Sequence, residues 1–221
     1  MNIAQDNSDN VALTEITSLC VRNGLLPGLV RDYVDAIADR QRINPVRDWI
    51  DSKPWDGQDR LVALQETLTV RDDFPTELRD LLIRKWLRSA VAAAILEEGF
   101  RCRGVLTLQG DQSIGKTSWV LSLLPPELQK ELLKVDHHLD PNNKDSILSA
   151  VSHWIVEIGE LDSSFNKDVA RLKGFLTSNA DKVRRPYARS DSEYARRTVF
   201  CATVNQTTFL NRPGFCGGQL V

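Results

Sequence analysis

The sequence feature that most constrains the fold is a phosphate-loop motif, G-x-x-x-x-G-K-[ST], at residues 110–117. A short β-prone run, Gly104–Gln109, precedes the motif. An apolar stretch with helical spacing, Ser118–Leu124, follows it. Strand, glycine-rich loop and helix form the context in which such a loop binds phosphate, because loop N–H groups and the helix N-terminus attract anions. A chance match is expected in roughly one chain in a hundred of this length. The flanking elements favour a nucleotide site over that alternative.

The motif assigns chemical roles to its last two residues. We expect Lys116 to contact the β- and γ-phosphates and the hydroxyl of Thr117 to bind Mg²⁺. The predicted nucleotide-binding residues are Gly110, Asp111, Gln112, Ser113, Ile114, Gly115, Lys116, Thr117 and Ser118.

Apolar residues at helical spacing dominate the chain up to about Phe100. The predicted helices there are Val11–Asn23, Pro27–Gln41, Val46–Ser52, Arg60–Leu68 and Pro75–Gly99, the last one ended by Gly99. Farther on, strands and helices alternate. Besides Gly104–Gln109 and Ser118–Leu124, the predicted elements are strands Trp154–Ile158 and Thr198–Val204 and helices Pro126–Leu133, Asn143–Val151 and Asn166–Thr177. This alternation is typical of a three-layer α/β domain. We therefore expect an N-terminal helical region at 1–100 and a P-loop core at 101–221.

Composition excludes several classes of protein. The formal net charge of −2 excludes a generally basic nucleic-acid-binding protein, so any such contact must come from a local patch. No C-x-x-C pair is present, which is typical of reduced thiols and not of a disulfide framework or a zinc site. We interpret His137, His138 and His153 as loop and strand-edge residues. No leader-like apolar run occupies residues 1–10 and no window reaches a membrane-spanning length, so we expect a cytoplasmic protein without membrane contact.

Acidic and polar side chains follow the two apolar strands after the phosphate loop. Glu157 and Glu160 lie at the end of the first strand, where a parallel sheet presents functional groups. We predict that Glu157 binds the metal and that Glu160 activates water, although the sequence alone leaves the division of roles open. Asn205, which closes the next strand, is a candidate for orienting the water or contacting the γ-phosphate. Alternatively, Glu157 and Glu160 are solvated acids after a strand, and Asp162 caps the next helix. Asn205 is then an ordinary turn residue.

A basic segment with an aromatic residue lies between these two strands. The predicted DNA-binding residues are Lys182, Arg184, Arg185, Tyr187 and Arg189, with Arg196 and Arg197 following. Arginines can track a phosphate backbone while a tyrosine stacks on a base. A solvated loop is the alternative. We call Arg184, Arg185 and Arg189 the hairpin cluster.

The chain resembles the virulence-associated protein E proteins, helicase-like ATPases of prophages and mobile genetic islands. The resemblance begins with Asn44–Ile50, Trp55–Gly57 and Arg60–Leu61, and continues through Leu106–Thr117, Trp154–Asp162 and Arg185–Tyr187 to Asn205. It covers roughly Asn44 to Leu210. It implies an AAA+-like core, ATP with Mg²⁺, a hexameric ring and single-stranded DNA in its centre, gripped by the basic segment as a pore hairpin.

Two features depart from the family pattern. The upstream region is too short for the primase module that the family commonly carries. The run Asn211–Val221 replaces the segment expected to supply a trans-acting arginine. We therefore expect weak ring assembly and slow ATP turnover for the 221-residue chain.

Three functional hypotheses follow from these observations. The first is a DNA-dependent ATPase that forms the helicase core of a mobile-element replication protein. The second is a nucleotide-gated binding or regulatory module without turnover. The third is a P-loop kinase of a small substrate. The paired glutamates and the arginine-rich segment argue against the kinase, and stimulation of ATP turnover by single-stranded DNA separates the first two.

Overall fold

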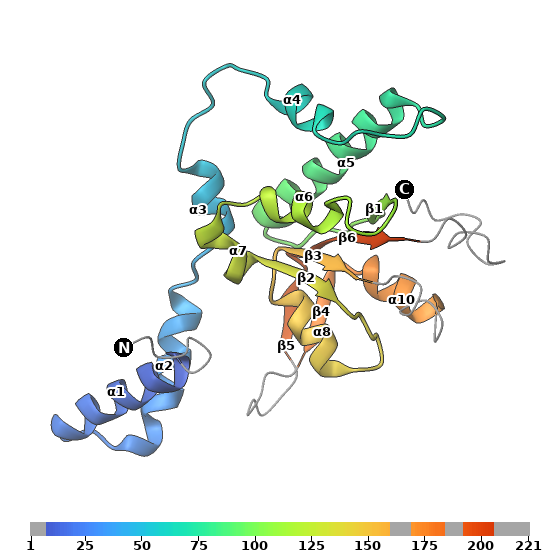
Figure 1. The fold of residues 1–221 in the computed structure, drawn as a ribbon. Coiled ribbons are helices and arrows are strands. Elements are labelled where there is room, and N and C mark those ends of the chain that lie inside the picture. The colour runs from blue at the N-terminus through green and yellow to red at the C-terminus, as the bar shows by residue number, and fades with distance from the viewer. Residues whose placement is uncertain (1–7, 160–168, 184–191, 206–221) are drawn as a thin grey trace. The chain divides into compact units, whose positions relative to one another are not determined.

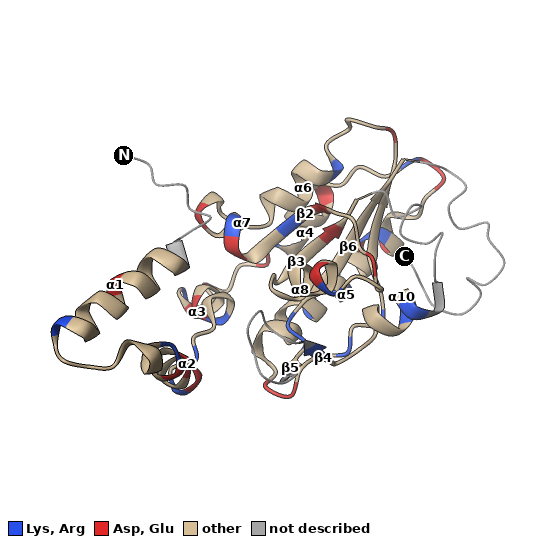
Figure 2. Ribbon diagram, turned by 90° about the horizontal axis from the view of Figure 1, so that it is seen from below, with Lys and Arg blue, Asp and Glu red and all other residues tan. Residues whose placement is uncertain are grey.

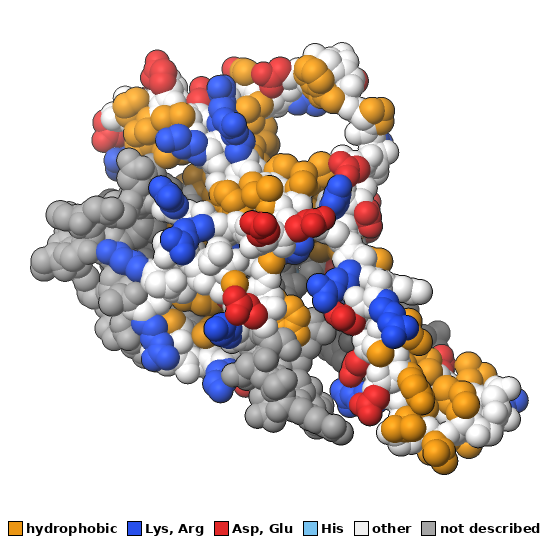
Figure 3. Space-filling view, turned by 180° about the vertical axis from the view of Figure 1, so that it is seen from behind, with side chains coloured by type: hydrophobic (Ala, Val, Ile, Leu, Met, Phe, Trp, Pro, Cys, Tyr) orange, Lys and Arg blue, Asp and Glu red, His pale blue; other side chains and the backbone are white. Residues whose placement is uncertain are grey.

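The computed structural model describes residues 8–159, 169–183 and 192–205. The chain divides into two compact units, Met1–Pro45 and Val46–Val221. In the first unit, helix α1 (Ser8–Arg22) is followed by a 3₁₀ turn η2 (Pro27–Leu29) and helix α2 (Val30–Arg40). Val30 is the one buried hydrophobic residue among those described in this unit. Several large apolar side chains of the unit are exposed, and they gather on the face seen in Figure 3.

The second unit is built on a parallel four-stranded sheet in the order β1-β6-β3-β2 (Figure 1). Its strands are β1 (Leu106–Gln109), β2 (Leu133–His137), β3 (Ile155–Ile158) and β6 (Val199–Val204). The remaining described helices are α3 (Pro45–Asp51), α4 (Leu61–Glu66), α5 (Thr76–Ile95), α6 (Lys116–Ser122), α7 (Pro126–Leu132), α8 (Lys144–Val151) and α10 (Val169–Leu176).

Helices cover both faces of this sheet. On one face, side chains of α5, α6 and α7 pack against alternate strand residues such as Ile155, Val199 and Cys201. On the other face, side chains of α8 and α10 pack against the intervening residues, such as Val156 and Phe200. Successive side chains of a strand point to opposite faces, so a sheet covered on both sides needs continuous apolar strands. The structure confirms the predicted three-layer α/β class with an N-terminal helical region.

The sequence did not reveal strand β2. The helix predicted at Pro126–Leu133 ends one residue earlier, and Leu133 begins the strand. Two charged residues, Lys134 and Asp136, interrupt the apolar pattern of β2. Its pairing with β3 shifts register between Lys134 and His137. A β-bulge of this kind hides the two-residue periodicity on which strand prediction depends.

The predicted role of Gly99 as a helix end is wrong. Helix α5 ends at Ile95, and Leu96 is its C-cap. Gly99 has φ +83°, and a Cβ there would lie 2.3 Å from the carbonyl oxygen of Asn179. A glycine is therefore required because another segment of backbone approaches it closely.

An antiparallel hairpin of β4 (Ala180–Val183) and β5 (Ser192–Ala195) precedes β6. At its base, the buried guanidinium of Arg196 pairs with Asp181 and lies 4.5 Å from the ring centroid of Phe175. Arg197 donates to the carbonyl oxygen of Ala94 at 2.7 Å. These two arginines thus join the hairpin to the core and are not part of an open basic surface.

Charged residues of both signs are interspersed over the described helices and loops, as Figure 2 shows for one side. None of the helices in the described ranges combines the length and the apolar character that a bilayer-spanning segment needs.

Candidate nucleotide-binding site

The phosphate loop connects β1 to α6, and its conformation depends on its glycines. Gly115 has φ +95°, the left-handed region that glycine adopts without steric cost, and α6 begins at the next residue. A Cβ on Gly110 would lie 2.5 Å from Cδ1 of Ile114, so the loop folds closely over its own start. The N–H of Gly110 donates to the carbonyl oxygen of Val204 at 3.1 Å, which fixes the loop to the end of β6.

The ammonium group of Lys116 lies inside this loop. Nζ donates to the carbonyl oxygens of Gly110 at 2.8 Å and Asp111 at 2.6 Å. It also donates to Oδ1 of Asn205 at 2.8 Å. An ammonium group has three N–H donors, and these three acceptors use all of them. The structure thus joins Lys116 to Asn205, which lies 89 positions later in the chain.

Glu157 is fully buried, with an exposed fraction of 0%. Its Oε1 accepts hydrogen bonds from the hydroxyls of Thr117 at 2.7 Å and Thr203 at 2.8 Å. Its Oε2 accepts from the backbone N–H of Asp136 at 3.2 Å. A buried carboxylate requires such donors because desolvation otherwise disfavours its charged form. The two predicted metal-binding residues, Thr117 and Glu157, are therefore in direct contact.

The order of the strands explains how these contacts form. Strand β6 lies between β1 and β3, and the carboxyl ends of all three reach the same edge of the sheet. Thr203 and Asn205 are two positions apart at the end of β6, so their side chains point to the same side. Thr203 contacts Glu157, while Asn205 contacts Lys116.

Sequence reasoning missed Thr203 and Asp136. A signal for Thr203 was its two-residue spacing from Asn205. Asp136 gave no such signal, because its contribution is a backbone N–H exposed by the bulge in β2. Asp136 has φ +50°, which aspartate tolerates better than most residues. Its carboxylate packs on Gly159, where a Cβ would lie 2.1 Å from Oδ1.

Comparison with known proteins identifies the family. The Virulence-associated protein E-like domain matches residues 50–214, which is more than half of the chain. The chain belongs to this family. This confirms the resemblance seen in the sequence.

No curated protein matches this virulence-associated protein E-like chain. Among solved structures, the apo A form of the NrS-1 C-terminal region is similar, with a TM-score of 0.47 and 20% sequence identity. That match covers 73% of this chain and 36% of the NrS-1 region, so the chain spans well under two thirds of that structure.

The site chemistry fits a magnesium ion held together with a nucleotide. Mg²⁺ is usually bound by one or two carboxylates together with phosphate oxygens and water, not by an all-protein cage. Thr117 and Glu157 supply one hydroxyl and one carboxylate. Within the described ranges, no group of three or more His, Cys, Asp or Glu side chains suited to a metal occurs.

Several predicted residues of the virulence-associated protein E-like domain lie outside the described residues. They are Glu160 and, on the basic segment, Arg184, Arg185, Tyr187 and Arg189. Lys182 is described, and it lies on β4 with its ammonium group 3.6 Å from Glu193 across the hairpin. Both side chains of this pair are mostly exposed, and such surface pairs contribute little to stability.

Proposed function

We propose that this chain is an ATP-binding and ATP-hydrolysing helicase-type core that acts on single-stranded DNA in the replication of a phage or mobile element. The observation that carries the proposal is the joint contact of Lys116 with Asn205 and of Thr117 with Glu157. These contacts bring the phosphate loop to a carboxylate and an amide at one edge of the sheet. Membership of the virulence-associated protein E-like family supports the same conclusion.

The residues of the loop divide the work of binding. Lys116 would transfer its donors from loop carbonyls to the β- and γ-phosphate oxygens, where charge-assisted hydrogen bonds are stronger. Thr117 and Glu157 would hold Mg²⁺, which when bound offsets charge on those phosphates. Asn205, which contacts Lys116, would then lie near the γ-phosphate of the bound nucleotide.

Hydrolysis requires a base besides these groups. In the proposed reaction, water attacks the γ-phosphorus, the bond to the β-phosphate oxygen breaks, and ADP and phosphate leave. Glu160 follows Glu157 by three residues and is our candidate to accept the proton of the water. Glu157 is already engaged by three donors, which favours the metal role for it.

The hairpin of β4 and β5 supports the DNA part of the proposal. Lys182 lies on β4, and the hairpin cluster and Tyr187 follow in the segment that connects the two strands. A row of cations with one aromatic ring is suited to a single strand, because the cations contact phosphates while the ring stacks on a base. In the family's hexameric ring, this segment would line the central pore.

The decisive experiment is ATP turnover with and without single-stranded DNA. We expect DNA to stimulate release of phosphate by the wild-type chain and not by Lys116→Ala. Lys134→Ala, which changes a lysine of β2 outside the loop, is the matched control. ATP binding without turnover, with or without DNA, would instead indicate a nucleotide-gated binding module. Equal ATP affinity of wild type and Lys116→Ala would refute the nucleotide site.

A further inference from the structure

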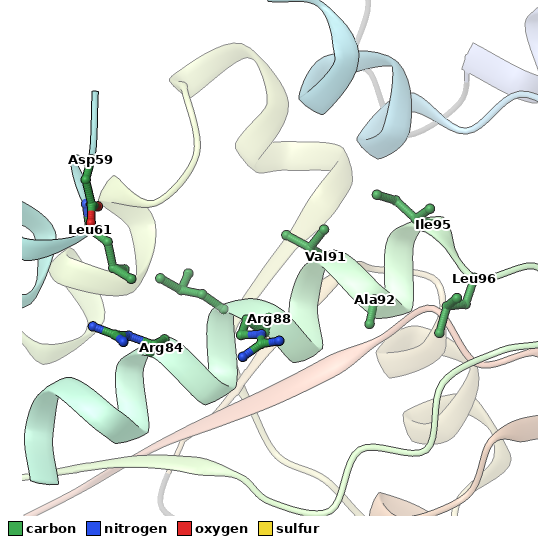
Figure 4. A pocket seen from close by; sticks show the side chains of 9 residues that line it. Asp59, Leu61, Arg84, Arg88, Val91, Ala92, Ile95 and Leu96 are labelled. Atoms are coloured by element: carbon green, nitrogen blue, oxygen red, sulfur yellow. The ribbon is translucent and has the colours of Figure 1, made fainter. Parts of the chain in front are cut away.

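Helix α5 has two apolar faces, and its own unit covers one of them. Trp86, Ala90, Ala93 and Ala94 are buried in the core beside strand residues, and Ile83 of the same helix is also buried. The other face forms a groove of about 650 Å³. The groove is lined by Asp59, Leu61, Arg84, Leu87, Arg88, Val91, Ala92, Ile95 and Leu96 (Figure 4).

The groove has an apolar floor and a basic end. Val91 and Leu96 are 40% and 48% exposed, and hydrophobic side chains gather over this stretch of α5 beside basic ones (Figure 3). Arg84 lies near Leu61, and Arg88 lies about one turn further along α5 (Figure 4). Within the described residues, neither arginine has an ion-pair partner. The carboxylate of Asp59, which also lines the groove, accepts from the backbone N–H of Leu61 at 2.8 Å.

The segment that leads into this groove presents a tryptophan to solvent. Trp55 is 80% exposed, and hydrogen bonds within residues 55–60 link the turn that carries it. Asp56 binds Arg60 through two hydrogen bonds, at 2.8 and 2.6 Å, and the indole Nε1 of Trp55 donates to the carbonyl oxygen of Gln58 at 3.3 Å. The Arg60 guanidinium lowers the pKa of Asp56 to about 2. An exposed tryptophan whose indole is already hydrogen-bonded in place is characteristic of an interface anchor.

We propose that Trp55 of one copy of this chain inserts into the α5 groove of a second copy. An indole buries about 150–250 Å² of surface when it is enclosed, and a groove of about 650 Å³ has room for it. Arg84 and Arg88 supply cations for the negative face of the ring, so the groove is electrostatically complementary to an aromatic anchor. Nucleic acid is the less suitable occupant. The segment 46–96 holds eight Lys and Arg against nine Asp and Glu, and the groove floor is apolar.

This contact does not depend on nucleotide binding, and its test needs none. Sedimentation velocity of the full chain over a concentration series measures self-association. Trp55→Ala removes the anchor, and Val91→Glu places a carboxylate in the groove. We expect each variant to weaken association at least about 30-fold, the usual effect of losing an anchor tryptophan. Val62→Glu, at an exposed valine of α4 outside the groove, should leave association unchanged.

Mixing the two variants gives the sharpest result. A mixture of Trp55→Ala and Val91→Glu chains contains one intact groove and one intact anchor, so it should form a 1:1 complex that neither variant forms alone. Circular dichroism and ATP binding check that both variants are folded. The proposal is overturned if wild type stays monomeric at every concentration reached, if either variant associates like wild type, or if the mixture does not associate.

Discussion

The hydrogen bond from Thr203 to Glu157 gives the most specific prediction. Thr203→Val replaces the hydroxyl by a methyl group of similar size, so packing on β6 is nearly preserved. The fully buried carboxylate of Glu157 then loses one of its two donors at Oε1 and keeps the hydroxyl of Thr117. The remaining donor, the backbone N–H of Asp136, serves the other oxygen.

The size of the effect follows from the charge of the acceptor. A hydrogen bond to a charged group contributes about 1.5–3 kcal/mol, roughly twice the value for a neutral pair. For a chain of this length, each kcal/mol lost shifts Tm by about 2–4 °C. We therefore expect Thr203→Val to lower the Tm of the second unit by about 3–12 °C at neutral pH. The variant should also bind Mg²⁺ with ATP more weakly, because the carboxylate is less firmly held.

Thermal unfolding followed by circular dichroism checks the stability, and calorimetric titration with Mg²⁺ and ATP checks the binding. Thr203→Ser keeps the hydroxyl and is the matched control, so it should recover most of the loss. A double-mutant cycle with Glu157→Gln isolates the charged contact, and Thr203→Val should cost less in the neutral background. Equal losses for Thr203→Val and Thr203→Ser, or an unchanged loss in the Glu157→Gln background, would refute the reasoning.

Three further predictions concern the catalytic base, the DNA contact and the backbone at Gly99. Glu160→Gln should bind ATP like wild type but fail to release phosphate, and the same phenotype in Glu157→Gln alone would show that the two roles are reversed. Neutralising the hairpin cluster should flatten the log–log salt dependence of single-stranded DNA binding by up to about two units, at roughly 0.7 per phosphate contact. An unchanged slope would indicate a structural loop. Gly57→Ala, at φ +84° with open space around it, should lower the free energy of urea unfolding only by the strain of a left-handed backbone, about 1–2 kcal/mol. Gly99→Ala should lower it by more, because its Cβ would also clash with the backbone of Asn179.

The sequence alone determined the local features of this protein. The phosphate loop could be predicted because its signal, the glycine spacing between a strand and a helix, lies within one short stretch of the sequence. The strand that carries Glu157 and the strand that precedes Asn205 could be predicted because both are mostly apolar runs, as a sheet buried on both faces requires. The helical N-terminal region followed from apolar spacing in the same way.

The tertiary structure decided which of these local elements meet. The position of β6 between β1 and β3 joins Lys116 to Asn205 and Thr203 to Glu157, and strand order depends on packing between segments far apart in the chain. The bulge at Asp136 provides a backbone donor that no side-chain pattern could reveal. Gly99 has its role because the backbone of Asn179 approaches it, a contact between residues 80 positions apart that periodicity within either segment does not encode.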